Sequence, residues 1–443
     1  MPTKTKTTTK AAGGQNAALW AERERLVAIG SAAYTHIVID RAQNAAVWDV
    51  DGKEYIDFAG GIGALNVGHC HPKVIAAIRE QAGKLLHTSF HVAAYPGYIE
   101  TVRRLVEVCP GPGEKKAILF NSGSEAIENA IKFARAYTKR RGVIAFTNAF
   151  HGRTLLCLTL DGKYKPLRQG FGPAPAEIYR SAFPYPYRAP RGVDPKELTE
   201  HCLERLEQLF VSDVAPEDTA AIVVEPIQGE GGFIVPTPGF LPGLRKICDK
   251  HGITLIVDEV QSGFARTGRM FACEHEGVAP DLMVVGKSIG AGTPISGVVG
   301  KKEIVDSAAV GAVGGTYGGN PLACAAAIAS FDIFRDENLV ERARRIGETV
   351  QKRFDALRDK VSIVGDSRGV GAMRALELVK DRKTKEPYPA KPIIAACEER
   401  GLIVLKAGPF DNVVRTLMPL TIEDADLNRG LDVLEDVLKT ASR

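Results

Sequence analysis

The stretch ITLIVDEVQSGFARTGRMFACEHEGVAPDLMVVGKS, residues 253–288, decides the fold that the sequence predicts. Two short apolar runs within it, Ile253–Val257 and Leu282–Val285, are typical of buried strands in a parallel sheet. Asp258 follows the first run and Lys287 closely follows the second. Because ligands of open α/β sheets bind beyond the carboxyl ends of the strands, both side chains are expected to project into one crevice.

Asp258 and Lys287 admit two interpretations. An isolated acid and lysine at strand ends are more often a structural ion pair than a functional one. A lysine that attacks a carbonyl group must be partly deprotonated, and the cofactor that most often uses such a lysine is pyridoxal 5′-phosphate. That cofactor also needs a phosphate site, an acid at its ring nitrogen and an apolar surface for its ring. Whether the rest of the sequence supplies these features therefore distinguishes the structural ion pair from a cofactor site.

Composition places the chain among globular proteins. Its 443 residues allow two or three domains, and 45% are hydrophobic and 25% charged. A net charge of +4 without blocks of like charge does not indicate nucleic acid or a membrane surface as a partner. No apolar run reaches the length of a membrane span. The lysine- and threonine-rich residues 1–16 are expected to form a mobile tail rather than a targeting signal.

The eight cysteines are scattered singly without C-x-x-C spacing, which favours free thiols in a reducing cytoplasm. Cys70 lies between His69 and His71, but the sequence GHCHP is typical of a turn before a helix, and no second cluster of metal-binding residues accompanies it. We therefore expect a cytoplasmic protein without a metal site.

Residues 117–137, AILFNSGSEAIENAIKFARAY, predict a strand followed by a helix. Ser122 and Glu125 have the spacing of a capping box, which places Gly123 and Ser124 at the helix N-terminus. Free amides and the positive end of the helix dipole suit a phosphate there. A well-capped helix without a ligand would show the same pattern.

Six more side chains carry candidate chemistry. Phe150 and His151 offer flat faces, and Arg153 offers a two-pronged donor suited to a carboxylate. Glu225 ends an apolar strand, and Glu230 lies in a glycine-flanked loop where a mobile acid could pair with an arginine in one state and release it in another. Arg415, within the apolar strand NVVRTLM, needs an anion or an acid beside it.

The order of predicted elements divides the chain. An N-terminal segment, residues 17–70, includes a hairpin at Asp51-Gly52 and is expected to pack with the C-terminal domain. Residues 71–335 form a large α/β domain with a mostly parallel central sheet, in which 161–218 are interpreted as a surface excursion without chemistry of its own. Runs of strands and helices over 336–443 predict a smaller α+β domain.

Seven motifs taken together resemble the class III, or omega, aminotransferases of pyridoxal-phosphate fold type I, and most of all their bacterial 4-aminobutyrate branch. The resemblance runs from about residue 25 to the C-terminus. Each motif alone is weak, but their common order is specific. They are NSGSEA (121–126), FHGRT (150–154), EPIQGEGG (225–232), DEVQSGFARTG (258–268), GKS (286–288), GGTYGGNPLA (314–323) and VVRTLMPL (413–420).

The resemblance implies how pyridoxal 5′-phosphate is bound. Lys287 is implied to form a Schiff base with the cofactor and to carry the proton during transfer, and Asp258 to keep the ring nitrogen protonated. Further contacts are implied to the phosphate, both ring faces and the ring oxygen. These contacts come from Gly123, Ser124, Phe150, Val260, Gln261 and, from the partner subunit of a homodimer or a dimer of dimers, Thr316.

The resemblance also implies a ping-pong reaction that moves the amino group of 4-aminobutyrate to 2-oxoglutarate, giving succinate semialdehyde and glutamate. Arg153 is implied to take the distal carboxylate and Arg415 the α-carboxylate of glutamate, while Glu230 neutralises Arg415 when 4-aminobutyrate is bound. Glu225 is implied to set the polarity beside the ring.

Ile62 is expected near the substrate entrance, beside His91, a position where the 4-aminobutyrate branch carries glutamine. Alternatives for the donor are 5-aminovalerate, β-alanine, ornithine and acetylornithine.

Overall fold

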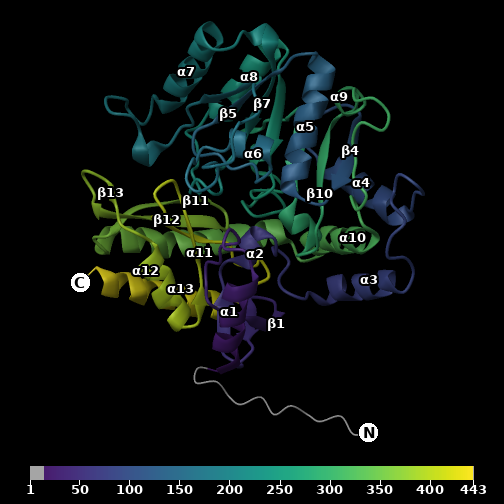
Figure 1. Ribbon diagram of the computed structural model, residues 1–443. Coiled ribbons are helices and arrows are strands. Elements are labelled where there is room, and N and C mark those ends of the chain that lie inside the picture. Colours follow the sequence, from purple (N-terminus) through teal and green to yellow (C-terminus); the bar gives the residue numbers. More distant parts are fainter. Residues whose placement is uncertain (1–13, 443) are drawn as a thin grey trace.

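The computed structural model describes residues 14–442, so nearly all of the predicted tail lies outside the described part, and its last residues, from Gly14, already begin a helix. A seven-stranded sheet forms the centre of the larger lobe, at the top of Figure 1. Its strands, in spatial order, are β4 (Lys115–Phe120), β10 (Ser296–Lys301), β9 (Leu282–Val285), β8 (Thr254–Asp258), β7 (Thr219–Val224), β5 (Gly142–Phe146) and β6 (Ile178–Ser181).

Within this sheet β10 runs antiparallel to both of its neighbours, whereas β9, β8, β7, β5 and β6 pair in parallel. The predicted mostly parallel α/β sheet is therefore confirmed. Successive side chains of β7 enter different apolar clusters, since Ile222 and Val224 belong to one and Ala221 and Val223 to the other. Both faces of the sheet are thus covered, which is why its strands read as continuous apolar runs.

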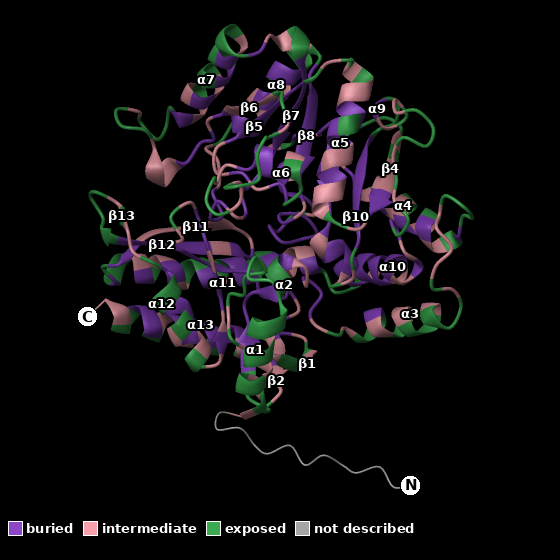
Figure 2. Ribbon diagram, viewed as in Figure 1, coloured by how far each residue is buried: buried purple, intermediate pink, exposed green. Residues whose placement is uncertain are grey.

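Helices cover the two faces of the sheet, as the purple interior of Figure 2 shows. On one face α5 (Gly123–Thr138), α6 (Leu155–Leu160) and α9 (Lys302–Val305) pack; α4 (Pro96–Val108), α7 (Leu198–Ser212) and α8 (Phe240–His251) pack on the other. The apolar helix α10 (Pro321–Asp336), capped by Asn320, packs against α3 (Pro72–Ala82), α4 and the short 3₁₀ helix η4 (Lys287–Gly290). Three further 3₁₀ turns are η1 (Pro186–Arg188), η2 (Pro216–Asp218) and η3 (Ala272–Glu276).

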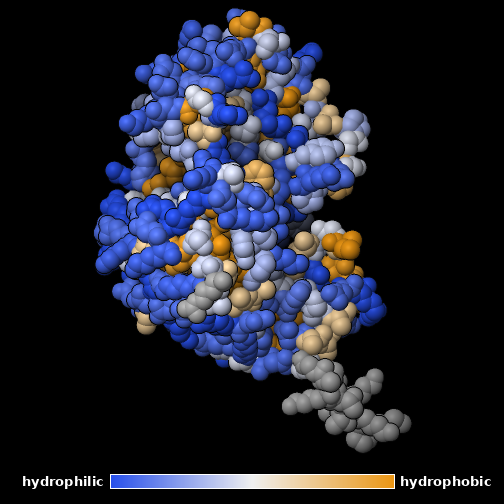
Figure 3. All heavy atoms as spheres, turned by 90° about the vertical axis from the view of Figure 1, so that its left-hand side faces the viewer, coloured by the Kyte–Doolittle hydropathy of each residue, from blue (hydrophilic) through white to orange (hydrophobic). Residues whose placement is uncertain are grey.

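The C-terminal residues form a smaller lobe around an antiparallel sheet. Its strands are β11 (Val364–Val370), β12 (Met373–Asp381), β13 (Glu386–Pro387), β15 (Leu405–Ala407) and β16 (Val413–Thr416). The helices of this lobe are α11 (Leu339–Lys360), α12 (Lys391–Glu399) and α13 (Asp424–Ala441). Figure 3 shows one side of the molecule, where hydrophilic side chains dominate and apolar ones are scattered.

The N-terminal residues join this lobe through a separate sheet. It consists of β1 (Ile39–Gln43), β2 (Ala46–Asp49), β3 (Glu54–Asp57) and β14 (Leu402–Ile403), preceded by α1 (Gly14–Leu26) and followed by α2 (Gly60–Gly63). The hairpin predicted at Asp51-Gly52 joins β2 to β3. The run LIVLKAG, residues 402–408, forms two separate strands, because β14 pairs with β3 and β15 pairs with β16.

The interpretation of residues 161–218 as a surface excursion was wrong in part. This segment supplies β6, the edge strand of the central sheet, which pairs with β5. Asp161 is fully buried, and Tyr185 reaches the small lobe by donating its hydroxyl hydrogen bond to Glu377. Because the segment is rich in prolines and polar residues, the sequence did not indicate its short strand, the burial of Asp161 or the contact of Tyr185 with Glu377. Across the described part of the chain, no helix has both the length and the apolar character needed to cross a membrane.

Candidate active site

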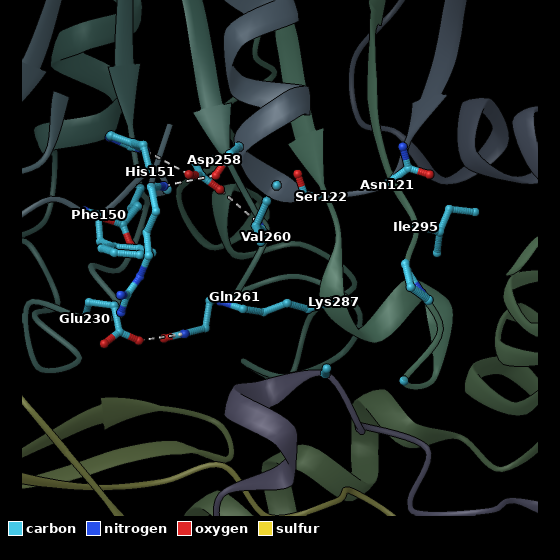
Figure 4. A pocket seen from close by; sticks show the side chains of 18 of the residues that line it. Asn121, Ser122, Phe150, His151, Glu230, Asp258, Val260, Gln261, Lys287 and Ile295 are labelled. Atoms are coloured by element: carbon cyan, nitrogen blue, oxygen red, sulfur yellow. Dashed lines mark hydrogen bonds and ion pairs between the residues drawn. The ribbon is translucent and has the colours of Figure 1, made fainter. Parts of the chain in front are cut away.

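A cavity of about 460 Å³ opens where β7, β8 and β9 end and α5 begins. It gathers most of the residues that the sequence singled out (Figure 4). Its lining comprises Ala64, Asn121, Ser122, Gly123, Ser124, Phe150, His151, Gly152, Arg153, Glu225, Glu230, Asp258, Val260, Gln261, Lys287, Gly292, Thr293, Pro294 and Ile295. The carboxyl ends of parallel strands and the start of a helix therefore meet in one site, as expected for an open α/β sheet.

Asp258, the last residue of β8, is held by two partners. Its Oδ2 lies 2.8 Å from Nδ1 of His151, and its Oδ1 accepts a hydrogen bond from the Val260 amide at 3.0 Å. Burial opposes protonation of His151, but the hydrogen bond and charge of Asp258 outweigh it and raise the pKa of the imidazole. The sequence offered His151 as a flat face; in the structure its Nδ1 fixes the orientation of the Asp258 carboxylate.

Lys287 is the first residue of η4 and has a left-handed backbone with φ of 49°. Such a conformation is uncommon outside glycine and is concentrated at functional sites. Burial lowers the pKa of its amine; the Glu230 carboxylate opposes that shift and the Arg415 charge adds to it. No hydrogen bond or ion pair joins Lys287 to Asp258, and in Figure 4 the two lie on either side of Val260. The structural ion pair is therefore excluded.

The N-terminus of α5 has the predicted capping box, in which Ser122 Oγ accepts the Glu125 amide and the Glu125 carboxylate accepts the Ser122 amide. The amides of Gly123 and Ser124, in the first turn, remain available at the cavity. Gly152 packs against this turn with φ of 135°, and a Cβ atom there would lie 2.0 Å from Ser124 Oγ. Only glycine therefore fits beside this anion site.

Glu225 lies under the loop that carries Phe150. Its two carboxylate oxygens accept the amides of Phe150 and Gly229, each at 2.9 Å. Burial raises the pKa of Glu225 to about 7; the charge of Asp258 acts in the same direction, whereas His151 and the two amides oppose the shift. Glu225 thus links the backbone of Phe150 to Gly229, where the loop that carries Glu230 begins.

Arg415, in β16, has a fully buried side chain and lies beside the predicted acid. Its NH2 atom is 2.7 Å from Glu230 Oε1, an ion-pair contact without the alignment of a hydrogen bond. Its NH1 atom donates only long bonds of 3.4 Å to Gln261 Oε1 and the Gly229 carbonyl. Burial opposes ionisation of Glu230, but Arg415 and Lys287 lower its pKa. Within residues 14–442, Arg415 therefore retains unused donors at Nε and NH2.

Arg153 is exposed at the cavity, and its guanidinium has no hydrogen bond or ion pair with any residue that the structure describes. Its backbone amide donates to Ser124 Oγ at 3.1 Å, which fixes where its side chain starts. An unpaired guanidinium at a cavity is suited to bind an anionic group from solution.

Three predicted site residues do not line this cavity: Ile62, Thr316 and Arg415. Ile62 is exposed near the lining residue Ala64 and has φ of 62°. Thr316 is exposed on the glycine-rich loop before α10, and Arg415 lies behind Glu230. Sequence reasoning missed the lining segment Gly292–Ile295, although its position directly after η4 could have signalled it.

The cavity fits pyridoxal 5′-phosphate by the chemistry of its donor set. A buried carboxylate, a lysine with a lowered pKa and a helix N-terminus with free amides surround one space. Phe150 and Val260 supply apolar surface within the same lining. These are the acid, amine, phosphate site and ring surface that the cofactor requires.

The family model for class III aminotransferases, "Aminotransferase class-III", matches residues 29–438. The chain is 48% identical to 5-aminovalerate aminotransferase of Pseudomonas aeruginosa, over 95% of this chain and 98% of that protein. It is 46% identical to 4-aminobutyrate aminotransferase of Escherichia coli, over 97% and 99%.

A solved amine transaminase from an uncultivated Pseudomonas species, in its PLP-bound form, aligns with a TM-score of 0.86 at 31% identity, covering 94% of this chain and 98% of that one. The chain therefore belongs to the pyridoxal-phosphate-dependent class III aminotransferases.

Proposed function

We propose that this enzyme transfers the amino group of 4-aminobutyrate to 2-oxoglutarate, giving succinate semialdehyde and glutamate, in two half-reactions at one site. The observation that carries the proposal is the buried, incompletely bonded Arg415 beside Glu230, together with an unpaired Arg153. In such a site Arg153 can bind a carboxylate at any time, whereas Arg415 can bind one only when Glu230 has moved away.

The two arginines divide the substrate between them. Arg153 binds the distal carboxylate of either amino donor, since its guanidinium needs no partner to be displaced. Arg415 binds the α-carboxylate of glutamate or 2-oxoglutarate after Glu230 has turned away. With 4-aminobutyrate, which has one carboxylate, Glu230 stays in place and neutralises Arg415. Ile62, exposed near Ala64, borders the substrate entrance.

Pyridoxal 5′-phosphate supplies an electrophilic carbon and a ring that stabilises a carbanion. Lys287, as the neutral amine favoured by its lowered pKa, takes the proton from the substrate carbon and returns it. Asp258, fixed by His151, holds a proton at the ring nitrogen.

The remaining cofactor contacts follow the lining of the cavity, and Glu225 sets the polarity beside the ring from beneath Phe150. Gly123 and Ser124 would hold the phosphate, Phe150 and Val260 would supply apolar surface for the ring, and Gln261 would bind the ring oxygen.

We also propose a cytoplasmic homodimer, or a dimer of dimers, with the division into residues 17–70, 71–335 and 336–443. All eight cysteines are free, as expected in a reducing compartment. Thr316 lies on an exposed loop outside the cavity, where it could serve the phosphate site of a second subunit. Pairing of β3 with β14 supports packing of the N-terminal segment on the small domain.

A second donor, 5-aminovalerate, is favoured by the 48% identity to an enzyme named for it. The test adds single amino donors to the holoenzyme and follows the absorbance band of the bound cofactor. We expect 4-aminobutyrate and glutamate to bleach the band, and 5-aminovalerate to do so with a lower kcat/KM. If only ornithine or acetylornithine reacted, the proposed donor would be wrong.

A further inference from the structure

The residues Gly229–Gly232, called here the Glu230 loop, carry the acid of the proposed switch. The loop starts where Gly229 donates its amide to Glu225 Oε1 at 2.9 Å. It then turns tightly, because the Gly232 amide donates to the Gly229 carbonyl at 3.0 Å. The loop follows β7 of the large lobe, yet the hydrogen bonds that its backbone carbonyls accept from residues distant in the sequence come from the small lobe.

Three small-lobe residues donate hydrogen bonds to the backbone of the Glu230 loop, and one of these is the long bond from Arg415 NH1 to the Gly229 carbonyl at 3.4 Å. The Gly408 amide donates to the Glu230 carbonyl at 2.9 Å, and Arg368 Nε donates to the Gly232 carbonyl at 2.8 Å. Gly232 has φ of 106°, and a Cβ atom on it would lie only 3.0 Å from Arg368 NH2. The guanidinium of Arg368 is therefore packed directly against the loop.

Arg368, in β11, is itself fixed on every side. Its NH1 atom donates to Asp366 at 2.8 Å and to Glu377 at 2.7 Å, and its NH2 atom donates to the Tyr185 hydroxyl at 3.0 Å. The Glu377 side chain is fully buried and also accepts Arg188 Nε at 2.5 Å. Because each nitrogen of the guanidinium has a partner, Arg368 can hold the loop without adjusting.

The side chain of Glu230 has fewer partners than the backbone of its loop, so it can rotate while the backbone stays in place. Its side chain is 24% exposed, and among the described residues its carboxylate is ion-paired only to Arg415, at 2.7 Å, and hydrogen-bonded only to Gln261, at 3.4 Å. Building on the proposed function, we infer that Arg368 is a positioning residue that holds the Glu230 backbone still. The switch then works by rotation of one side chain, and Arg368 sets the preference between donors with one and with two carboxylates.

Arg374 provides a matched control in the neighbouring strand β12. It also binds glycine carbonyls, donating to Gly371 at 3.0 Å and to Gly369 at 2.7 Å, and it reaches Gln351 at 2.9 Å. None of these partners belongs to the Glu230 loop. A lysine at this position should therefore disturb the small lobe without changing the switch.

The experiment compares Arg368→Lys with Arg374→Lys in the holoenzyme. Lysine keeps the positive charge toward Glu377 but lacks the fork that also reaches Gly232. Half-reactions with 4-aminobutyrate and with glutamate are followed separately by the absorbance of the cofactor. In Arg368→Lys we expect kcat/KM for 4-aminobutyrate to fall about tenfold and that for glutamate to change less than about threefold, because a displaced Glu230 leaves Arg415 unneutralised only with the first donor. Arg374→Lys should leave the ratio unchanged.

Equal losses for both donors, or the same shift in Arg374→Lys, would overturn the inference. If thermal unfolding shows that Arg368→Lys is not folded, Gly232→Ala displaces the loop from the other side of the same contact, and the ratio should move in the same direction. A wild-type enzyme inert toward 4-aminobutyrate would refute the proposed function itself. A reactive wild type with unchanged ratios in the variants would refute only the part assigned to Arg368.

Discussion

Two walls of the cavity satisfy their charges in opposite ways. On the wall formed by the ends of β7 and β8, Asp258 is bonded to His151 and to an amide, and Glu225 accepts two amides. On the other wall, the Arg153 guanidinium has no partner among the described residues, and Arg415, which lies behind the lining residue Glu230, has only an unaligned ion pair and two long bonds. We call them the fixed wall and the open wall.

The difference follows from what each wall has to bind. A cofactor that stays in place through many turnovers is best met by groups already oriented and charged, since no reorganisation is then needed during the reaction. Substrates that alternate between one and two carboxylates need donors that are left incompletely bonded, or are covered by an acid that can move. Changes to the fixed wall should therefore affect every donor alike, and changes to the open wall should separate donors or act mainly on binding.

The largest effect is expected from Asp258→Asn on the fixed wall. Asparagine keeps the size of the side chain but cannot stabilise a proton on the ring nitrogen, so kcat should fall by about 10³-fold with both donors. Steady-state kinetics with 4-aminobutyrate and glutamate check this. Asp281→Asn is the control, because Asp281 is buried and paired with Arg245 and Lys301 outside the cavity. A loss below tenfold, or a loss restricted to one donor, would remove the distinction between the walls.

Arg153→Ala tests the exposed half of the open wall. Removing this receptor should lower kcat/KM roughly 10²-fold, mainly through KM, for both donors, since each presents a distal carboxylate. The melting temperature should stay within about 1 °C, because the guanidinium is exposed and unpaired. Arg191→Ala, at an exposed position outside the cavity, should change neither quantity. A marked loss of stability in Arg153→Ala would show that Arg153 has a structural partner.

The fixed wall could be predicted from the sequence better than the open wall. Asp258 and Lys287 close apolar runs, and Ser122 with Glu125 marks a helix start, so periodicity and capping rules place them at one edge of the sheet. The ion pair that was first favoured for Asp258 and Lys287 failed because a cavity separates them.

The open wall depends on contacts between lobes, which no local pattern records. The sequence indicated that Arg415 needs an acid or an anion beside it. Which acid this is depends on the packing of β16 against the Glu230 loop, and that packing joins distant parts of the chain. Likewise His151 was taken for a flat face, since nothing in FHGRT reveals that its Nδ1 meets Asp258. The sequence indicated that Arg153 suits a carboxylate, but the exposure of its guanidinium at the cavity depends on the fold around it.

Glu230→Ala is expected to have a smaller, donor-specific effect. With 4-aminobutyrate, a buried Arg415 would lose the one acid that pairs with it among residues 14–442, so kcat/KM should fall roughly tenfold or more; with glutamate, whose α-carboxylate takes that place, it should change little. Half-reactions with each donor separate the two cases, and Glu230→Gln should give an intermediate loss with 4-aminobutyrate. Equal losses with both donors would contradict a switch on the open wall.

The smallest effect concerns the pH dependence of the fixed wall. The pKa of Glu225 is raised to about 7 from an ordinary value of 4.5, so the folded protein holds a proton that the unfolded chain releases. Below about pH 4.5 Glu225 is protonated in both the folded and the unfolded protein, so its burial costs no stability. As the pH rises from 4.5 toward 7, the unfolded chain ionises first and the free energy of unfolding falls. Glu225→Gln cannot ionise and should escape this loss. The melting temperature of Glu225→Gln minus that of the wild type should therefore be higher at pH 8 than at pH 5. At both pH values the variant loses some stability, because its amide NH₂ faces the Phe150 or the Gly229 amide, which is also a donor. If the difference between the two proteins did not change with pH, Glu225 would be ionised throughout and its burial offset by His151.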